Sequence, residues 1–275
     1  MKYLLIPLLS FIIYSCNLLE DSEESGTIDI ASGLIEALKI GADSATSTLS
    51  KTDGYFLDQT VKILLPSDIL EQIDNFKLKE INLGLINTTG AMIYESGFES
   101  LGINSMQSLE DDLILGINRA AESAATDALP VFLDAITSIT IEDAESILFG
   151  TDSAATEYLK EGTRSFLFDA YEPKMDDAIN EVKINGKSAD NMYKDFVDSY
   201  NTILNTEINV GLFTTNTIGE MADLDTLVIN DLSEYATNEG LDGLFLKVKE
   251  EEGKIRTNPL HRVTELLKDV FNKLD

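Results

Sequence analysis

The chain has 275 residues and a large excess of acidic over basic side chains. It contains 49 Asp and Glu residues against 20 Lys and Arg residues, which gives a formal net charge of −29 at pH 7. A chain this negative repels nucleic acid and anionic membrane surfaces, so nucleic acid is excluded as a partner. Hydrophobic residues make up 44% of the sequence, which is ordinary for a folded protein and too high for a disordered acidic chain. The acids are therefore expected to form a solvated surface around a conventional core.

The first fifteen residues have the pattern of a secretion signal. Lys2 supplies a positive charge, and Tyr3 to Tyr14 form an apolar run too short to span a bilayer. The residues Ile13, Tyr14, Ser15 and Cys16 resemble the lipobox of bacterial lipoproteins, in which the signal is removed just before a lipid-bearing cysteine. We interpret residues 1–15 as a lipoprotein signal peptide and Cys16 as the lipidation site. An ordinary secretion signal that happens to contain a cysteine is the alternative.

A lipidated Cys16 predicts a protein of the bacterial cell envelope, anchored to the outer membrane on its periplasmic or surface face. Because Cys16 is the only cysteine, no disulfide is expected, and stability has to come from packing. Residues 16–27 are acidic and poor in core residues, so we interpret them as a tether. Residues 28–275 are expected to form one helical domain.

Beyond the tether, apolar residues recur at intervals of three and four, which is the period of an amphipathic helix. The short apolar segment Val61 to Pro66 is expected to be extended, and Ser67 is expected to cap a helix through about Phe76. Further helix starts are predicted where Ser or Thr stands three residues before an acid, because each side chain can satisfy a free amide of the other. These candidate capping boxes are Ser108 with Asp111, Thr140 with Asp143, and Thr217 with Glu220.

The chain is predicted to close with a helix that begins at Asn258-Pro259, since proline is tolerated at the first helical position. The apolar stripe of that helix would comprise Leu260, Val263, Leu267, Val270, Phe271 and Leu274. Alternating strand patterns are scarce, and no sequence repeat is apparent. The predicted fold class is therefore all-α, with a short extended segment or a small hairpin within residues 55–105, where glycines interrupt the pattern.

The sequence holds few residues suited to catalysis or metal binding. His261 is the only histidine, so a His-rich zinc site is excluded, and no cofactor or metal is predicted. We interpret His261 as structural because it falls near a helix start. Motifs of nucleotide-binding loops and serine hydrolases are absent from the sequence. Acidic runs such as Glu110-Asp111-Asp112 lack the spacing of a calcium loop and are expected to be solvated.

Glu252 is the exception among the acids. On a helix of about 100° per residue it falls on the apolar face that precedes Asn258, whereas Glu250 points to the opposite side. A buried carboxylate needs a partner, and Arg256 stands four residues later, with Arg262 as a second candidate. We predict that Glu252, Arg256 and Arg262 form a buried polar network that specifies the fold; a catalytic acid or base in a cleft is the functional alternative.

Three segments of the chain resemble a known family. They lie within Leu38 to Pro66, Asp111 to Asn180 and Tyr235 to Phe271. Their motifs include Ser50-Lys51-Thr52-Asp53-Gly54, Asn118-Arg119-Ala120-Ala121-Glu122, Phe132-Leu133-Asp134-Ala135-Ile136, Leu241-Asp242-Gly243-Leu244-Phe245 and Asn258-Pro259. Together they are similar to the bacterial envelope family called domain of unknown function 4197. The resemblance implies a mostly helical, often lipid-anchored domain and carries no known activity. Residues 74–107 and 206–230 depart from the family pattern and look longer than usual.

The leading functional hypothesis is a non-enzymatic binding or scaffolding module on a lipid tether. Alanine-rich helices can line a groove for an apolar ligand or a partner helix, although ordinary core packing explains the same residues. Those alanines are Ala120, Ala121, Ala124, Ala125 and Ala128. The alternative is a hydrolase or lyase that uses buried carboxylates, with Arg119, Arg256 or Arg262 as anion anchors. Enzymatic activity is therefore left open by the sequence.

Overall fold

The computed structural model describes residues 29–83, 87–99, 102–209 and 214–275. The predicted signal peptide, Cys16 and the tether lie outside these residues. The described helices are α1 (Ile30–Leu49), α2 (Ser67–Lys77), α3 (Gly90–Ser96), α4 (Met106–Ala124), α5 (Ala128–Ser138), α6 (Ala144–Leu148), α7 (Ala154–Glu181), α8 (Ala189–Leu204), α9 (Ile218–Ala222), α10 (Leu232–Thr257) and α11 (Glu265–Phe271).

The strands are short and form three antiparallel hairpins. They are β1 (Glu80–Asn82) with β2 (Asn87–Thr89), β3 (Lys183–Ile184) with β4 (Lys187–Ser188), and β5 (Glu207–Asn209) with β6 (Thr215–Thr217). The all-α class is therefore confirmed, and the first hairpin lies within residues 55–105 as predicted. The other two were not anticipated, because strands of two or three residues are too short to show an alternating pattern.

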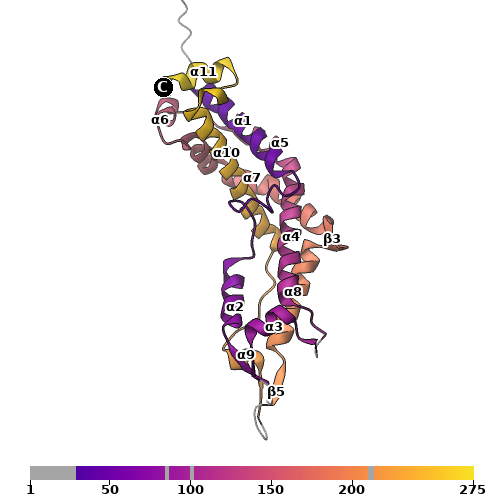
Figure 1. The fold of residues 1–275 in the computed structure, drawn as a ribbon. Helices are drawn as coiled ribbons and strands as arrows, with labels where there is room; N and C mark the ends of the chain where they lie inside the picture. Colours follow the sequence, from indigo (N-terminus) through magenta and orange to yellow (C-terminus); the bar gives the residue numbers. More distant parts are fainter. Residues whose placement is uncertain (1–28, 84–86, 100–101, 210–213) are drawn as a thin grey trace, which may run out of the picture.

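The helices build an elongated, bent molecule (Figure 1). One half holds α1, α5, α6, α10 and α11, and the other holds α2, α3, α8 and α9, with α4 and α7 near the middle. The beginning of α1 and the helix α11 lie at the same end, because a Cβ on Gly33 would fall 2.5 Å from the side chain of Val270. We call this the α11 end. The opposite extremity, where β5 is labelled, is the hairpin end.

The core runs through the whole length of the molecule as one cluster of buried apolar residues. α1 packs closely against α10, since a Cβ on Gly41 would lie 3.0 Å from Val248. Ala120, Ala121, Ala124, Ala125 and Ala128 are all buried in this cluster, so these alanines serve core packing. The small side chains let neighbouring helices approach closely.

Two buried side chains of α4 hold the irregular segment between α1 and α2. The carboxylate of Glu122 accepts hydrogen bonds from the backbone amides of Tyr55 and Phe56 at 3.3 and 3.2 Å. The amide side chain of Asn118 pairs with both backbone groups of Ile63, at 2.9 and 2.7 Å. Val61 to Pro66 therefore lies without a strand partner among the described residues, and Asn118 takes the place of a neighbouring strand.

Of the three predicted capping boxes, one is confirmed. Thr217 and Glu220 exchange both bonds of the motif at the start of α9. The prediction for Ser108 is wrong because α4 begins earlier and is capped by Ser105. The prediction for Thr140 is wrong because the side chain of Asp143 caps α6. Likewise, Ser67 is the first residue of α2 and does not cap it. In each case the pattern occurs within a few residues of a true helix start. At α4 and α6 another side chain reaches the free amides, whereas α2 follows Pro66 and has no side-chain cap.

The closing helix differs from the prediction. Pro259–His261 form a single turn of 3₁₀ helix, and α11 begins only at Glu265, capped by Thr264. The stripe residues Leu267, Val270 and Phe271 are buried, but Leu260 and Val263 are 88% and 68% exposed. The backbone of Arg262 is not helical, with φ −83° and ψ 74°. The chain therefore turns at Arg262 and leaves the first two stripe residues outside the core.

The hairpin end contains a sequence repeat, which corrects the expectation of a chain without repeats. The strands β1 and β5 both read Glu-Ile-Asn, and in each case the next three residues are an aliphatic residue, glycine and leucine. Each hairpin follows a helix that packs on the core, α2 or α8, and leads into a short helix, α3 or α9. The segments 67–96 and 189–222 are thus two copies of one helix–hairpin–helix unit.

Corresponding contacts support this equivalence. The cap residues Thr89 and Thr217 each accept a bond from the amide three residues later, at 3.2 and 3.1 Å. The first helical amide of each copy donates back across the hairpin, from Gly90 to Lys79 and from Ile218 to Thr206. The units contact each other through α9 and β1. They overlap residues 74–107 and 206–230, the two segments that the sequence led us to expect would depart from the family pattern.

Gly90 should be irreplaceable in the first unit. A Cβ at this position would lie 1.8 Å from the carbonyl oxygen of Phe76, and backbone cannot move away as a side chain can. We expect Gly90→Ala to lower the free energy of unfolding by about 1–3 kcal/mol or more. As a matched control, Gly253→Ala in α10 meets only Asp152 at 3.8 Å and should raise stability by about 0.5–1 kcal/mol. Urea unfolding measures both; changes of the same sign would contradict the packing described.

Candidate functional site

The three residues of the predicted polar network all lie in the interior near the α11 end. Glu252 is 1% exposed, Arg256 3% and Arg262 1%. The guanidinium of Arg256 lies 2.8 Å from the Glu252 carboxylate, as the spacing of four residues on one helix allows. Glu250 is exposed and pairs with Lys247. The helical period of α10 thus buries one acid of the run and leaves its neighbour in solvent.

Glu252 caps a helix to which it does not belong. Its carboxylate oxygens accept bonds from the backbone amides of Ala155 at 3.0 Å and Thr156 at 2.7 Å, and from the Thr156 hydroxyl at 2.5 Å. These amides are in the first turn of α7, where no preceding turn offers an acceptor. Ser153, at the usual capping position, makes no side-chain cap. The anionic group also lies at the positive end of the helix dipole.

Arg256 caps the end of α6, the helix that precedes α7. Its guanidinium donates to the carbonyl oxygens of Ile147 at 3.1 Å and Leu148 at 2.6 Å, the last two residues of α6. These carbonyls have no partner further along their own helix. The ion pair of Glu252 and Arg256 therefore fixes the end of α6 and the start of α7 onto α10.

Arg262 has a different role from the one that its spacing suggested. It donates to the carbonyl oxygens of Ile255 and Arg256 in the last turn of α10, at 3.0 and 2.9 Å. Its carboxylate partner is Asp275 at 2.6 Å, rather than Glu252. The hydrogen bond from Arg262 lowers the pKa of the Asp275 carboxyl below its ordinary value. Arg262 thus joins the end of α10 to the residues that follow α11.

The other two buried carboxylates are also occupied by donors of the fold. Glu122 accepts hydrogen bonds from the amides of Tyr55 and Phe56 and forms an ion pair with Arg119 at 2.6 Å. Arg119 forms a second ion pair with Asp53. Glu110 accepts a bond from the hydroxyl of Tyr94 at 2.9 Å, and burial together with this carboxylate raises the pKa of that tyrosine. Each of the three buried carboxylates of the described residues is thus bound by amide, hydroxyl or guanidinium groups of the fold.

The remaining candidates for metal or acid–base chemistry are not grouped. His261 is partly exposed, and its Nδ1 lies 3.4 Å from a carboxylate oxygen of Glu251. Among the described residues, no three His, Cys, Asp or Glu side chains are close enough together to hold a metal ion. The buried hydroxyls of Tyr171 and Thr237 have no hydrogen-bond partner among the described residues, and neither residue lines the cleft at the hairpin end.

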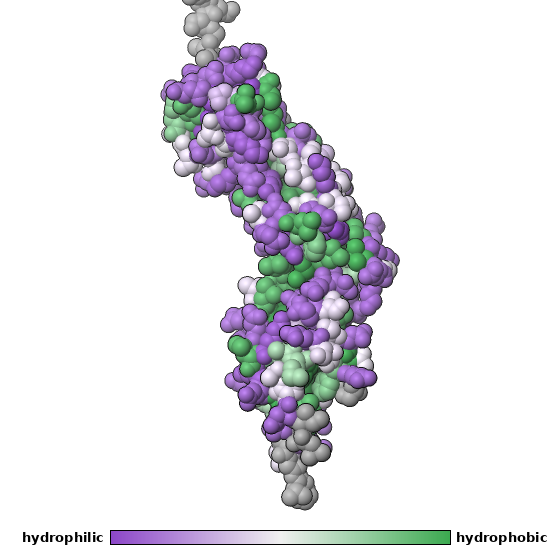
Figure 2. All heavy atoms as spheres, viewed as in Figure 1, coloured by the Kyte–Doolittle hydropathy of each residue, from purple (hydrophilic) through white to green (hydrophobic). Residues whose placement is uncertain are grey.

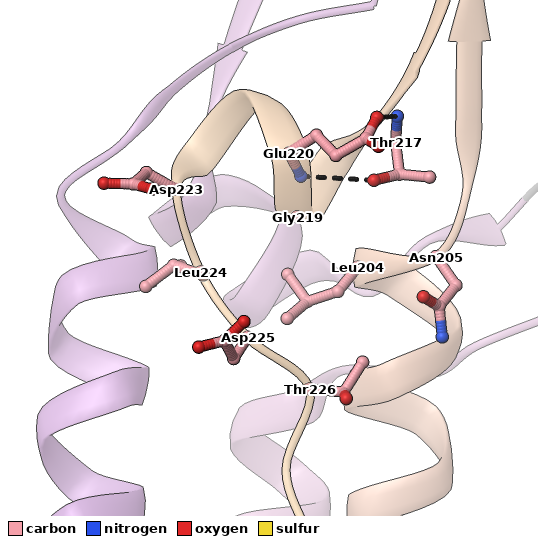
Figure 3. Close-up of a pocket in the computed structure, with 9 residues that line it drawn as sticks. All are labelled: Leu204, Asn205, Thr217, Gly219, Glu220, Asp223, Leu224, Asp225 and Thr226. Atoms are coloured by element: carbon pink, nitrogen blue, oxygen red, sulfur yellow. Dashed lines mark hydrogen bonds between the residues drawn. The ribbon is translucent and has the colours of Figure 1, made fainter.

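Surface clefts occur on both halves, and the one in Figure 3 lies at the hairpin end. It has a volume of about 430 Å³ and is bounded by the end of α8, by α9 and by the segment that follows α9. Glu220, Asp223 and Asp225 line it, and no Lys, Arg or His does. Figure 3 shows the Glu220 carboxylate bonded to the amide of its capping partner Thr217. This cleft therefore offers no paired acid and base.

A second surface feature lies at the bend, where Figure 2 shows apolar atoms gathered between the two halves. The segment 223–231 runs along α8, tied by bonds of Leu227 to Asn201 and of Asn230 to Tyr193. Between these ties, Val228 and Ile229 are 71% and 48% exposed. Leu64 is also exposed. Its backbone carbonyl oxygen accepts a 2.9 Å hydrogen bond from the hydroxyl of Tyr235.

We call the exposed apolar residues Leu64, Val228 and Ile229 the bend patch. Burial raises the pKa of Tyr193 and of Tyr235, and the carboxylate of Asp68 raises both pKa values further. Asp68 lies four residues after Leu64 in the sequence. These two tyrosines bind Asn230 and Leu64, respectively. The carboxylate of Asp68 therefore lies close to both segments of the bend patch.

Carboxylates without basic partners adjoin the bend patch. Asp231, two residues after Ile229, caps α10. Burial raises the pKa of Glu172 on α7, and the carboxylates of Asp176, Asp231 and Glu234 raise it further. No Lys or Arg forms an ion pair with any of these four acids in the described structure. The sequence signal for the patch was three consecutive apolar residues, Leu227 to Ile229, in a segment otherwise rich in polar residues.

The fold and these sites can now be set beside known proteins. The chain belongs to the family described as "Protein of unknown function (DUF4197)", whose model matches residues 24–87 and 95–272. The match is interrupted inside the first helix–hairpin–helix unit and continues through the second. No curated protein and no solved structure matches the chain. In the described residues, no helix is both long and apolar enough to cross a bilayer.

The capping role of Glu252 predicts a large effect of its removal. Glu252→Ala leaves Arg256 buried without its partner and exposes two amides of α7 to an apolar interior, so we expect a loss of about 3–5 kcal/mol in the free energy of unfolding. Glu250→Ala removes an exposed pair and should cost less than about 1 kcal/mol. Urea unfolding compares them. Equal, small losses would mean that the carboxylate of Glu252 does not support the fold.

Proposed function

We propose that this protein is a lipid-anchored component of the bacterial envelope whose helical domain binds a partner without catalysing a reaction. The anchor is supported by the pattern Ile13 to Cys16 after a short apolar run. Two or three acyl chains at Cys16 would hold the protein firmly, since one chain alone gives only marginal binding. The acidic residues 17–24 then serve as the start of a tether between the lipid and the domain.

The single observation that carries the binding function is the bend patch beside its unpaired carboxylates. Apolar side chains exposed next to one another on a folded domain are typical of interaction surfaces. Burial raises the pKa of Glu172, and the carboxylates of Asp176, Asp231 and Glu234 raise it further, so a positively charged partner would relieve the repulsion among these acids. A cationic amphipathic segment satisfies both features, with its apolar face on the bend patch and its basic residues on the acids.

A hydrolase or lyase is less well supported. Such an enzyme needs two carboxylates with separated pKa values that converge on a cleft. Glu110, Glu122 and Glu252 instead bind amides, hydroxyls and guanidinium groups of the fold. The arginines proposed as anion anchors are similarly engaged with carboxylates and carbonyl oxygens.

The lipid anchor predicts the behaviour of a Cys16→Ser variant. Without a sulfur atom to acylate, the domain should move from the membrane fraction to the soluble envelope fraction and keep its helical content. Fractionation after a high-salt wash, followed by circular dichroism of the released protein, measures this. A variant that stays in the membrane pellet would show that the attachment does not depend on Cys16.

The binding function predicts a defined peptide affinity. A labelled helical peptide of Lys and Leu with all leucines on one face should bind, and a peptide of the same composition with scattered leucines should bind about tenfold less tightly. Binding should weaken with salt, which screens the acids over roughly 8 Å at physiological ionic strength. The double variant Val228→Ser, Ile229→Ser should lose the preference for the amphipathic peptide. Fluorescence anisotropy measures each affinity.

The matched control is Phe166→Ser, which removes a half-exposed apolar side chain from α7 and should leave the preference unchanged. None of these substitutions alters the net charge, so a change in affinity reports on the apolar contact. Equal binding of both peptides to the unsubstituted protein would mean that attraction is electrostatic only, and the bend patch would then have no role.

A further inference from the structure

Two strongly exposed aliphatic side chains lie at the α11 end. Leu260 is 88% exposed and Val263 is 68% exposed, on the turn that joins α10 to α11. The turn is well fixed. Asn258 caps it through the amide of Leu260 at 3.1 Å, and the fully buried guanidinium of Arg262 binds both the end of α10 and Asp275. The two side chains are thus held outside by a rigid turn, and no neighbouring element of the described structure covers them.

The charge of this part of the chain differs from that of the rest. Residues 254–275 contain five Lys or Arg and three Asp or Glu residues, whereas the remaining residues contain 15 basic and 46 acidic ones. An acidic surface is repelled by anionic lipid headgroups. Arg256 and Arg262 are buried, so the other charged residues of this segment are three lysines and three acids. The segment that carries Leu260 and Val263 therefore lacks the large excess of acid found in the rest of the chain.

The position of α1 brings the anchor to the same end. Gly33 in the first turn of α1 packs directly on Val270 of α11. Cys16 precedes Ile30 by 14 residues, which span at most roughly 50 Å when fully extended. A lipid on Cys16 would therefore keep the α11 end within roughly 50 Å of the membrane, and the bent molecule carries the hairpin end to the opposite extremity (Figure 1).

We infer that the turn from Asn258 to Thr264 is a membrane contact, in which Leu260 and Val263 enter the interface of the phospholipid bilayer to which the chain is anchored. This inference rests on the lipid anchor proposed above. Apolar side chains on such a contact sit roughly 5–10 Å deep, at the boundary of headgroups and acyl chains. Contact at this turn orients the molecule, so that the bend patch and the hairpin end face away from the lipid.

The chain contains no tryptophan, so a single introduced tryptophan reports its own environment. We would place it at Leu260 in the full acylated protein reconstituted into vesicles of phosphatidylethanolamine and phosphatidylglycerol, with and without brominated acyl chains. The matched control is Leu78→Trp, an 82% exposed site beside the first hairpin. Val263→Trp provides a second reporter in the same turn, and urea unfolding verifies that each variant is folded.

We expect the emission of Leu260→Trp and Val263→Trp to shift to shorter wavelength on vesicles and to fall about twofold with brominated lipid, because the side chain reaches the acyl boundary. Leu78→Trp should keep the emission that it has in water. Absence of quenching at both turn positions overturns the membrane contact. Flotation of the same vesicles separates the two proposals: protein that floats without quenching keeps its anchor but not this orientation, and protein that does not float lacks the anchor as well.

Discussion

The architecture depends on buried charged side chains that cap helices other than their own. Glu252 supplies the acceptors for the start of α7, and Arg256 supplies the donors for the end of α6, so their ion pair joins three helices at one point. A buried ion pair gives little net stability compared with apolar packing, but removal of one partner is costly. Here the ion pair fixes the position of a helix start, because α7 has 28 residues and lacks a side-chain cap of its own. The start of the longest described helix is thus set by α10.

This arrangement separates the molecule into regions of different chemistry. The α11 end carries the turn with Leu260 and Val263 and contains the beginning of α1, the first described helix. The bend combines apolar side chains with unpaired carboxylates, and the hairpin end repeats one helix–hairpin–helix unit. The proposed anchor would hold the protein by one end and leave its bend open to partners, as a scaffold requires. The buried carboxylates bind groups of the fold.

The parts of this arrangement that follow from local periodicity could be predicted from the sequence. The helical class and the inward position of Glu252 both depend on spacing within one helix, and Arg256 lies within the same turn. The partners of Arg262 depend on how the chain reverses after Asn258, so spacing alone suggested Glu252 where the structure has Asp275. The same reversal exposes Leu260 and Val263, which a continuous helix would have buried. The hydrogen bonds of Glu122 with Tyr55 and of Asn118 with Ile63 join residues more than fifty positions apart, which spacing within one helix cannot predict. The strands of the two hairpin units are too short to be detected by an alternating pattern.

The most direct test of this account is native-state hydrogen exchange at the amides of Ala155 and Thr156. If the carboxylate of Glu252 caps α7 in the interior, these amides should exchange only through global unfolding, as slowly as amides in the middle of α7. The amides of Ser233 and Glu234 provide the comparison, because Asp231 caps them locally near the surface, and they should exchange faster. Rapid exchange at Ala155 and Thr156, equal to that at Ser233 and Glu234, would contradict the claim that α10 fixes the start of α7.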